Sequence, residues 1–378
     1  MKNKDQQIYD VAVAGSGIVG LAMAYHASKR GLKTAVFERN PAASGATVRN
    51  FGMIWPFGQP LETFDRAMRS REIWLELSAK AGFWAAETGA LCLAYEDDEW
   101  SVLEEFYETR CKAGYRIDLL DPVSVSGKSK AVQPNRLKGA LWSATEVNID
   151  PREATRKIHR YLRESAGVDF YYNTPINFID LPWVGNAQNS WQADRVFVCG
   201  GADFETLYPE IFAESGITRC KLQMMRTVTQ PEGWALGPTL CGGLTLQHYQ
   251  SFAHCSALRP LKDRYAAELP EYNDWGIHVL VSQTSLGEIT LGDSHEYGLD
   301  LSPFDRAHIN QLILDYLGRF ASFPKMEIAE TWHGVYPRLK GKTELVVDAE
   351  EGVTIVNGLG GAGMTLSFGL AGEIMDKM

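Results

Sequence analysis

The sequence predicts an α/β protein in which a mostly parallel sheet is interleaved with a second domain, built on an antiparallel sheet plus helices. Three observations predict this class. A strand, a glycine-rich turn and a helix follow one another over residues 9–30. The same succession returns over residues 353–370. Between these units, several strand-like segments follow in series over residues 221–292, which is typical of an antiparallel sheet.

The first unit has the pattern of a Rossmann-like, dinucleotide-binding βαβ motif. A short buried strand is expected over residues 9–14, and it runs directly into Gly-Ser-Gly-Ile-Val-Gly at 15–20. A helix is expected over residues 21–30 and a second strand over residues 33–38. A strand before the glycines, a helix after them and an acidic residue that ends the second strand favour dinucleotide binding over a turn without a ligand.

Each glycine of this turn has its own physical reason. Gly15 permits a tight turn, Gly17 lets backbone N–H groups approach a pyrophosphate, and Gly20 lets helix and strand pack closely. The positive end of the helix dipole then faces the phosphates. Glu38 can accept hydrogen bonds from ribose hydroxyls. Because NAD and FAD share this fingerprint, the unit alone leaves the cofactor open.

Three further stretches favour a flavin. Residues 41–53 are mostly small and polar, which suits close passage along a pyrophosphate and a flavin. Residues 192–201 are expected to form a late parallel strand that ends in Gly200-Gly201 at a ligand crevice. Residues 357–365 are rich in glycine, and a helix is expected to begin near Met364. The dipole of such a helix would face the flavin edge where a reduced, anionic ring is most negative.

Seven motifs, in matching order and spacing, carry a resemblance to a known family over nearly the whole chain. They are GSGIVG at 15–20 with Glu38-Arg39, SGATVRNFG at 44–52, VNIDP at 147–151, ADRVFVCGG at 193–201, LGDS at 291–294, WHGVYP at 332–337 and NGLGGAGMT at 357–365. The chain resembles the D-amino-acid oxidase, sarcosine oxidase and glycine oxidase family of FAD-dependent amine oxidoreductases. The segment at 46–52 is most similar to a bacterial subgroup associated with phosphonate breakdown, thought to act on amino- or N-methylaminoalkylphosphonates.

The resemblance implies which residues contact FAD. Those expected to hold its ADP part are Gly15, Gly17, Gly20, Glu38 and Arg39. Those expected along its ribityl chain and ring are Ala46, Thr47, Asn50 and Gly52. Ile176, at the end of a strand expected over 171–176, would offer its backbone to the adenine, and Gly200 would lie beside the cofactor. Those expected to meet the flavin are Gly361, Gly363, Met364 and Thr365.

The attachment of FAD is expected to be non-covalent. Some relatives attach FAD through a cysteine on the late strand beside the active site, and others through an amino-terminal histidine. In this chain no cysteine follows Cys255, and the segment at 44–52 contains no histidine.

The activity that the resemblance implies is oxidation of a small primary or secondary amine by hydride transfer to flavin N5, giving an imine that hydrolyses. The substrate would be an amino acid, an N-methyl amine or an aminophosphonate. The cofactor supplies the difficult step, so the protein has mainly to fix the remote end of the substrate. The candidate residues for this end are Arg49, Tyr336, Arg338, His248, Tyr249 and Lys340.

One departure from the family bears on the substrate. D-Amino-acid and glycine oxidases typically bind the substrate carboxylate with the arginine of a G-x-R-P sequence. Tyr336 stands at that position in this chain, which argues against simple D-amino-acid oxidation. Arg49 or Arg338 could supply the contact instead, because a guanidinium binds a carboxylate or a phosphonate through two parallel hydrogen bonds.

The motifs divide the chain into two interleaved domains. The FAD-binding domain is expected over 1–80, 142–219 and 326–378, and the substrate domain over 81–141 and 220–325. Residues 71–141 are expected to be mostly helical, for example at 73–80 and 99–113. The strands expected in the second insertion are 221–229, 245–253, 275–282 and 288–292.

Composition and charge exclude several other classes. Of the 378 residues, 45% are hydrophobic and 22% are charged, which is usual for a folded globular protein. The net charge is −10 without a basic stripe, so nucleic acid is not expected as a partner. The six cysteines form no CxxC pair and the eight histidines have no zinc-binding spacing. Reduced thiols in the cytoplasm, no metal and no membrane span are therefore expected.

Two other functions stay open at this point. A nicotinamide-dependent dehydrogenase would use the same amino-terminal unit, but it leaves the glycine-rich stretch at 357–365 without a role. A flavin-binding protein with a structural or tRNA-modification role would not oxidise amines, and the acidic charge disfavours the tRNA version. The oligomeric state is also open.

Overall fold

A parallel core of five strands carries the predicted cofactor motifs. The computed structural model describes residues 7–378. The parallel strands lie in the order β20 (Val353–Asn357), β12 (Ser190–Val198), β1 (Ile8–Ala14), β2 (Thr34–Phe37) and β9 (Asp169–Tyr171). Because their carboxyl ends share one edge of the sheet, the loops that follow β1, β2, β12 and β20 come together there.

Three antiparallel strands extend this sheet to eight. β19 (Leu345–Glu350) pairs with β20, and the hairpin of β10 (Phe178–Asp180) and β11 (Trp183–Gly185) pairs with the first residues of β12. The hairpin strands are three residues long and border the parallel core without interrupting it.

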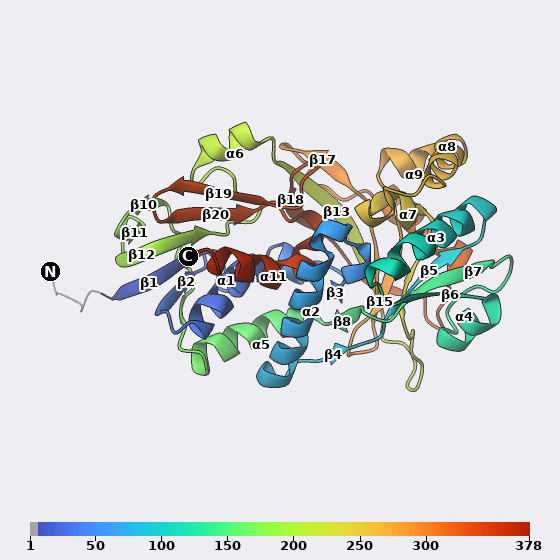
Figure 1. The fold of residues 1–378 in the computed structure, drawn as a ribbon, viewed down its shortest axis with the longest axis horizontal. Helices are drawn as coiled ribbons and strands as arrows, with labels where there is room; N and C mark the ends of the chain where they lie inside the picture. The colour runs from blue at the N-terminus through green and yellow to red at the C-terminus, as the bar shows by residue number, and fades with distance from the viewer. Residues whose placement is uncertain (1–6) are drawn as a thin grey trace.

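Four helices pack together against this sheet (Figure 1): α1 (Ile18–Lys29), α2 (Leu61–Ala81), α5 (Pro151–Glu164) and α11 (Gly363–Met375). Most residues of α1 and α11 are buried, because these two helices are enclosed by the sheet and by their neighbours. α5 is amphipathic, and its buried Ala154, Ile158 and Leu162 recur at every fourth position.

The second sheet has nine strands and is mainly antiparallel. Their order is β17 (Glu296–Gly298), β13 (Thr218–Thr227), β16 (Ile289–Gly292), β15 (Leu280–Gln283), β14 (Thr239–Cys241), β5 (Ala90–Ala94), β7 (Gly139–Ser143) and β6 (Ile117–Leu120), with β18 (Ile328–Arg338) also paired to β13. The helices α3 (Asp97–Arg110), α8 (Leu258–Glu268) and α10 (Ala307–Phe320) share its hydrophobic core.

Short elements complete the chain. A three-stranded sheet joins β3 (Met53–Ile54), β8 (Val147–Ile149) and β4 (Ala85–Ala86). Three short helices are α4 (Pro122–Lys128), α6 (Pro209–Ser215) and α9 (Pro270–Asp274). Among residues 7–378, no helix combines the length with the apolar composition that crossing a bilayer would require.

The predicted fold class, with one mostly parallel sheet and one mainly antiparallel sheet plus helices, is confirmed. The domain boundaries stay a prediction. The hydrogen bonding of β18 bears on them, since this strand pairs with β13 in the antiparallel sheet, whereas the prediction places 326–378 in the cofactor-binding domain.

The strand expected over residues 245–253 is wrong. This stretch contains α7 (Leu244–His248) and a 3₁₀ turn at Gln250–Phe252. Three consecutive residues, Leu244, Thr245 and Leu246, are buried, which a helical turn in the core allows and an alternating strand does not. Packing has therefore overridden the strand-forming tendency of the threonine, tyrosine and phenylalanine in this stretch.

The helices expected at 73–80 and 99–113 are confirmed, by α2 and by α3 with the 3₁₀ turn that follows it, but residues 71–141 also contain β4, β5, β6 and the start of β7. β5 was not expected, because it is buried on both faces and its continuous apolar run resembles a buried helix. One further local expectation is wrong. The strand expected over 171–176 ends at Tyr171. There the chain turns through Asn173, which has a φ of 53°, and Pro175 cannot donate to a strand ladder.

Candidate active site

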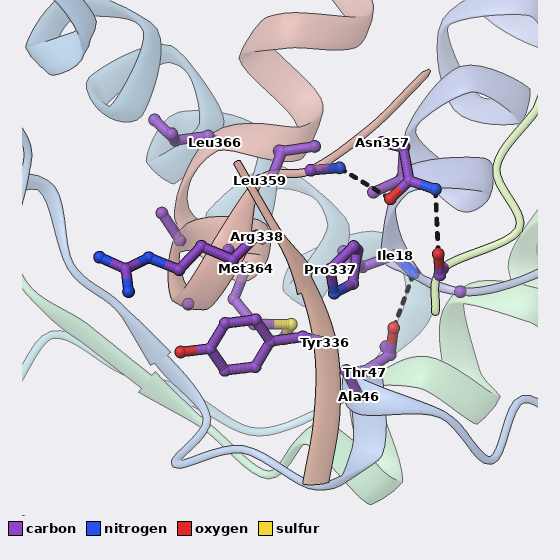
Figure 2. Close-up of a pocket in the computed structure, with 18 of the residues that line it drawn as sticks. Ile18, Ala46, Thr47, Tyr336, Pro337, Arg338, Asn357, Leu359, Met364 and Leu366 are labelled. Atoms are coloured by element: carbon purple, nitrogen blue, oxygen red, sulfur yellow. Dashed lines mark hydrogen bonds between the residues drawn. The ribbon is translucent and has the colours of Figure 1, made fainter. Parts of the chain in front are cut away.

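One cavity of about 1550 Å³ lies between the two sheets. It is lined by residues at the carboxyl ends of β1, β2, β12 and β20, and by residues of β13, β15 and β18 from the second sheet. Figure 2 shows part of its wall, to which Tyr336 and Arg338 of β18, Met364 of α11, and Thr47 contribute. Ligand pockets usually measure roughly 300–1,000 Å³, so this one has room for an extended cofactor together with a substrate.

The glycines of the first turn are held by close backbone contacts. Gly15 has a φ of +108°, and a Cβ on it would lie 2.3 Å from the carbonyl oxygen of Cys199. A Cβ on Gly20 would lie 1.9 Å from the carbonyl oxygen of Gly15. Gly15 and Gly17 line the cavity, whereas Gly20 lies behind the turn, where it allows the helix to pack against the strand.

Glu38 stabilises this turn and also lines the cavity. Its carboxylate accepts hydrogen bonds from the backbone N–H of Ser16 (3.1 Å), the Ser16 hydroxyl (2.8 Å) and the backbone N–H of Asn40 (3.0 Å). Each carboxylate oxygen can accept more than one hydrogen bond, so capacity for ribose hydroxyls remains. Arg39 lines the cavity as well, and its guanidinium forms an ion pair with Asp203.

The loop that follows β2 touches the first turn directly. The backbone N–H of Ile18, in the first turn of α1, donates to the Thr47 hydroxyl (2.9 Å; Figure 2). Asn50 donates to the carbonyls of Ala46 (3.1 Å) and Thr47 (2.9 Å), and it accepts from the N–H of Gly52 (2.8 Å). Ala46, Thr47 and Asn50 line the cavity, whereas Gly52 packs against Ile149 outside it.

The carboxyl-terminal glycine-rich turn closes the same edge. Asn357 donates to the carbonyl of Gly201 (2.9 Å) and accepts from the N–H of Gly358 (2.7 Å; Figure 2). The helix expected near Met364 is confirmed, since α11 begins at Gly363. The remaining residues expected at the cofactor, all in the cavity wall, are Ile176, Gly200, Gly361, Gly363, Met364 and Thr365.

These features fit FAD. The backbone is open at Gly201, where an added Cβ would meet nothing within 4 Å, and the amino end of α1 lines the cavity beside it. Residues 15–17, 38–39, 46–47, 49–50 and 357–365 border one continuous space, as an extended dinucleotide requires.

The five residues expected at the substrate share this space. Arg49, His248, Tyr249, Tyr336 and Arg338 all line the cavity, although they come from three separate segments. The sixth candidate, Lys340, is exposed and lies outside the cavity wall.

Burial sets the protonation of the part of the cavity lined by Arg49, His248, Tyr249, Tyr336 and Arg338, which we call the substrate end. Desolvation, with the nearby Cys220, raises the pKa of Tyr336 well above its usual range, so its hydroxyl stays a hydrogen-bond donor. Desolvation is also the main reason why the pKa of Tyr249 is raised. Desolvation, with the neighbouring His278, His295 and Arg338, lowers the pKa of His248 well below its usual range.

Four more residues line this part of the cavity and were not expected from the sequence: Trp55, His278, Asp293 and His295. His278 precedes β15 and Asp293 follows β16, and the backbones of these two residues exchange hydrogen bonds (3.2 and 2.8 Å). Asp293 and His295 are two residues apart, which suits side chains on one face of an extended segment. That spacing was the available signal, but it does not reveal His278, which pairs with Asp293 across the sheet.

A comparison with known families decides the class. The family model described as FAD dependent oxidoreductase (DAO) matches residues 10–377. The chain belongs to this family. The expected cofactor and the expected class of enzyme are therefore confirmed: this is an FAD-dependent oxidoreductase.

The relatives of this FAD-dependent oxidoreductase differ in what they are named for. A glycine oxidase from Bacillus licheniformis is 25% identical over 221 residues, which cover 54% of this chain and 57% of that protein. An anaerobic glycerol-3-phosphate dehydrogenase subunit from Escherichia coli (strain K12) is 30% identical over 161 residues, which cover 41% of this chain and 28% of that protein. The chain thus spans little more than half the length of the glycine oxidase, and less than a third of the length of the dehydrogenase subunit.

A solved structure agrees on the fold. The glycine oxidase from Geobacillus kaustophilus superposes with a TM-score of 0.75 at 18% identity, covering 98% of this chain and 94% of that one. At this identity the agreement concerns the fold alone.

Proposed function

We propose that this flavoprotein oxidises a small primary or secondary amine that carries an anionic group, giving an imine that hydrolyses. The substrate would be an amino acid, an N-methyl amine or an aminophosphonate. The observation that carries the proposal is the position of Arg49 and Arg338 in the cavity that also contains the cofactor motifs. Across residues 7–378 neither arginine forms an ion pair with a carboxylate. Arg49 donates to the carbonyl of His333 (3.1 Å), and Arg338 lies over the ring of Tyr297 (4.4 Å).

Each part of this end has a task in amine oxidation. A guanidinium binds a carboxylate or a phosphonate through two hydrogen bonds, which fixes the remote end of the substrate. Trp55 and Tyr249, whose rings stack 5.9 Å apart, provide an aromatic wall for the amine. FAD, which the loops after β1, β2 and β20 would hold, would supply the redox chemistry as the acceptor of two electrons from the substrate. The Tyr336 hydroxyl, kept protonated by burial that raises its pKa, is a donor for the substrate.

The names of the relatives support an anionic group on the substrate more directly than they support an amine on it. Glycine and glycerol 3-phosphate, for which two relatives are named, both carry an anion, but only glycine carries an amine. Oxidation of an anionic alcohol is therefore the second candidate function.

Anaerobic mixing with a panel of substrates tests the proposal. The panel contains glycine, N-methylglycine, a D-amino acid, 2-aminoethylphosphonate, its N-methyl derivative and glycerol 3-phosphate. We expect at least one anionic amine to bleach the flavin absorbance within the mixing time, with release of a carbonyl product. The proposal fails if no amine bleaches the flavin, and bleaching by glycerol 3-phosphate alone establishes the alcohol.

Two further measurements complete this experiment. The rate of reoxidation in air separates an oxidase from a dehydrogenase. Acid precipitation tests the attachment of the cofactor, since we propose non-covalent FAD and expect it to remain in the supernatant.

A further inference from the structure

Three imidazole rings meet at the substrate end of the cavity. His248 comes from α7, His278 precedes β15 and His295 follows β16. Their ring centroids lie 3.8, 4.4 and 5.1 Å apart in the three pairs. Each ring offers a nitrogen within 4.8 Å of those of the other two. The spacing of histidines along the sequence predicts no metal site, because these three come from separate segments that only the fold brings together.

Two polar atoms of this cluster lack a hydrogen-bond partner within the described residues. The Nδ1 of His295 lies 2.9 Å from the carbonyl of Gly276, which can only accept, so this nitrogen carries the proton. In the neutral ring the Nε2 then carries a lone pair, and it faces a carboxylate oxygen of Asp293 at 3.8 Å. The Nδ1 of His278 and the other oxygen of Asp293 are buried and make no hydrogen bond within the described residues, although this oxygen lies 3.2 Å from the Nε2 of His278.

Such an arrangement is costly unless a cation completes it. His278, His295 and Asp293 are 3–5% exposed, so solvent does not satisfy these atoms. A buried acceptor without a partner destabilises the folded protein.

We propose that His248, His278 and His295 bind a divalent transition-metal ion, with Asp293 as the neighbouring carboxylate. Three imidazole nitrogens and one oxygen suit Zn²⁺, whose bonds to them measure about 2.0–2.2 Å. A tetrahedral ion holds its ligand nitrogens about 3.4 Å apart, so modest rotation of the rings completes the site. The hydrogen bond from His295 to Gly276 fixes that ring and its protonated nitrogen, as the second contact of a metal-bound histidine commonly does.

The site faces the substrate. His248 is partly exposed and lines the cavity, as do the other three residues. Arg338 lines the same cavity and contributes a positive charge to it. A bound ion would therefore add a second positive centre for an anionic substrate. The ion itself does not depend on the proposed amine oxidation, and its test is separate.

Metal content and metal binding test the site in the flavin-loaded protein. We expect about one equivalent of zinc per chain in the protein as purified, by mass spectrometry. After dialysis against a chelator, calorimetric titration with Zn²⁺ should show one saturable site. The variants His278→Ala and His248→Gln should bind Zn²⁺ at least tenfold more weakly, whereas His308→Ala, which removes an exposed histidine outside the cavity, should bind as the wild type does.

The outcomes that overturn the proposal are equally specific. It is wrong if the wild type holds no metal and shows no saturable binding of Zn²⁺, in which case protons neutralise the cluster. It is also wrong if His248→Gln and His278→Ala bind as tightly as His308→Ala. Flavin content and circular dichroism show whether each variant is folded. If His278→Ala does not fold, two measurements still test the proposal. They are Zn²⁺ binding by His248→Gln, which changes a partly exposed residue, and the metal content of the wild type.

Discussion

At the cofactor end of the cavity the wall is mostly backbone and glycine, whereas at the substrate end it is mostly side chains from distant segments. The cofactor end uses the loops after four neighbouring parallel strands, and its polar groups are hydrogen-bonded: Glu38 accepts from Ser16, and Thr47 accepts from Ile18. At the substrate end, buried atoms of Trp55, His278 and Asp293 have no hydrogen-bond partner within residues 7–378.

This difference separates a preformed end from one that a ligand completes. Buried polar atoms are nearly always paired in folded proteins, so an unpaired atom in the wall of a cavity is one whose partner a ligand can supply. Substitutions at the cofactor end should therefore act on FAD binding and stability, and substitutions at the substrate end should act on KM.

The largest effect is expected for Gly20→Ala, at the cofactor end. The added Cβ would lie 1.9 Å from the carbonyl of Gly15 and 3.1 Å from Val13, so the helix and the turn must separate. We expect the free energy of unfolding to fall by more than about 3 kcal/mol, the upper end of the range for overpacking. The protein should also bind little flavin. The flavin-to-protein absorbance ratio and thermal unfolding measure it. Gly318→Ala, in α10 with open space around it, is the control, and normal flavin content in Gly20→Ala would contradict the expectation.

A smaller effect is expected for Arg338→Met, at the substrate end. Losing a hydrogen-bonded charge contact costs about 1.5–3 kcal/mol, so KM for the anionic amine should rise about 10- to 150-fold. FAD content should not change. Lys340→Met is the matched control, because this lysine lies two residues further on, exposed and outside the cavity. Steady-state kinetics measure KM for the anionic amine in both variants. An unchanged KM in Arg338→Met would leave Arg49 as the residue that binds the anion.

The difference between the cofactor end and the substrate end also explains which contacts can be predicted from the sequence. Gly15, Gly17 and Glu38 lie within 24 residues of one another, and their tasks follow from local geometry, so the cofactor end is predictable from a short motif. Thirteen of the fifteen residues expected to contact FAD line the cavity; Gly20 and Gly52 instead pack behind it.

The substrate end is only partly predictable for the opposite reason. Arg49 and Tyr336 belong to motifs and Arg338 directly follows one, but His278 reaches the site through the pairing of β15 with β16, which no local pattern reveals. The strand wrongly expected at 245–253 has the same cause, since the core around α7 decides its shape.

An effect smaller than that of Arg338→Met is expected for Glu38→Ala. The backbone N–H and the hydroxyl of Ser16 would lose their acceptor, which is worth roughly 1–2 kcal/mol, or about a 5- to 30-fold rise in the Kd for FAD. Quenching of flavin fluorescence on titration into apoprotein measures it. Glu38→Gln keeps one carbonyl oxygen and should lose less. Equal affinity in all three proteins would show that Glu38 has no part in holding the cofactor turn.

The smallest effect concerns pH, through a histidine of the cofactor end. The Nε2 of His159 donates to the carbonyl of Ser16 (3.0 Å), and its Nδ1 accepts from the Tyr172 hydroxyl (2.9 Å). Burial lowers the pKa of His159 below its usual value, so the folded protein keeps this ring neutral. As the pH falls below about 6.5, the unfolded chain binds a proton that the folded protein does not bind. The free energy of unfolding therefore decreases, by at most about 1.4 kcal/mol per pH unit for this residue.

The variant His159→Gln removes that contribution while keeping an N–H donor near Ser16. It should be less stable than the wild type at neutral pH, because the hydrogen bond from Tyr172 loses its acceptor. Its stability should nevertheless fall less between about pH 7.5 and about pH 5.5, since no proton uptake at this position opposes folding. Denaturant unfolding of the flavin-loaded protein at both pH values measures the two slopes. Parallel slopes would mean that His159 is protonated in the folded protein, and that the cofactor end tolerates a charge beside Ser16.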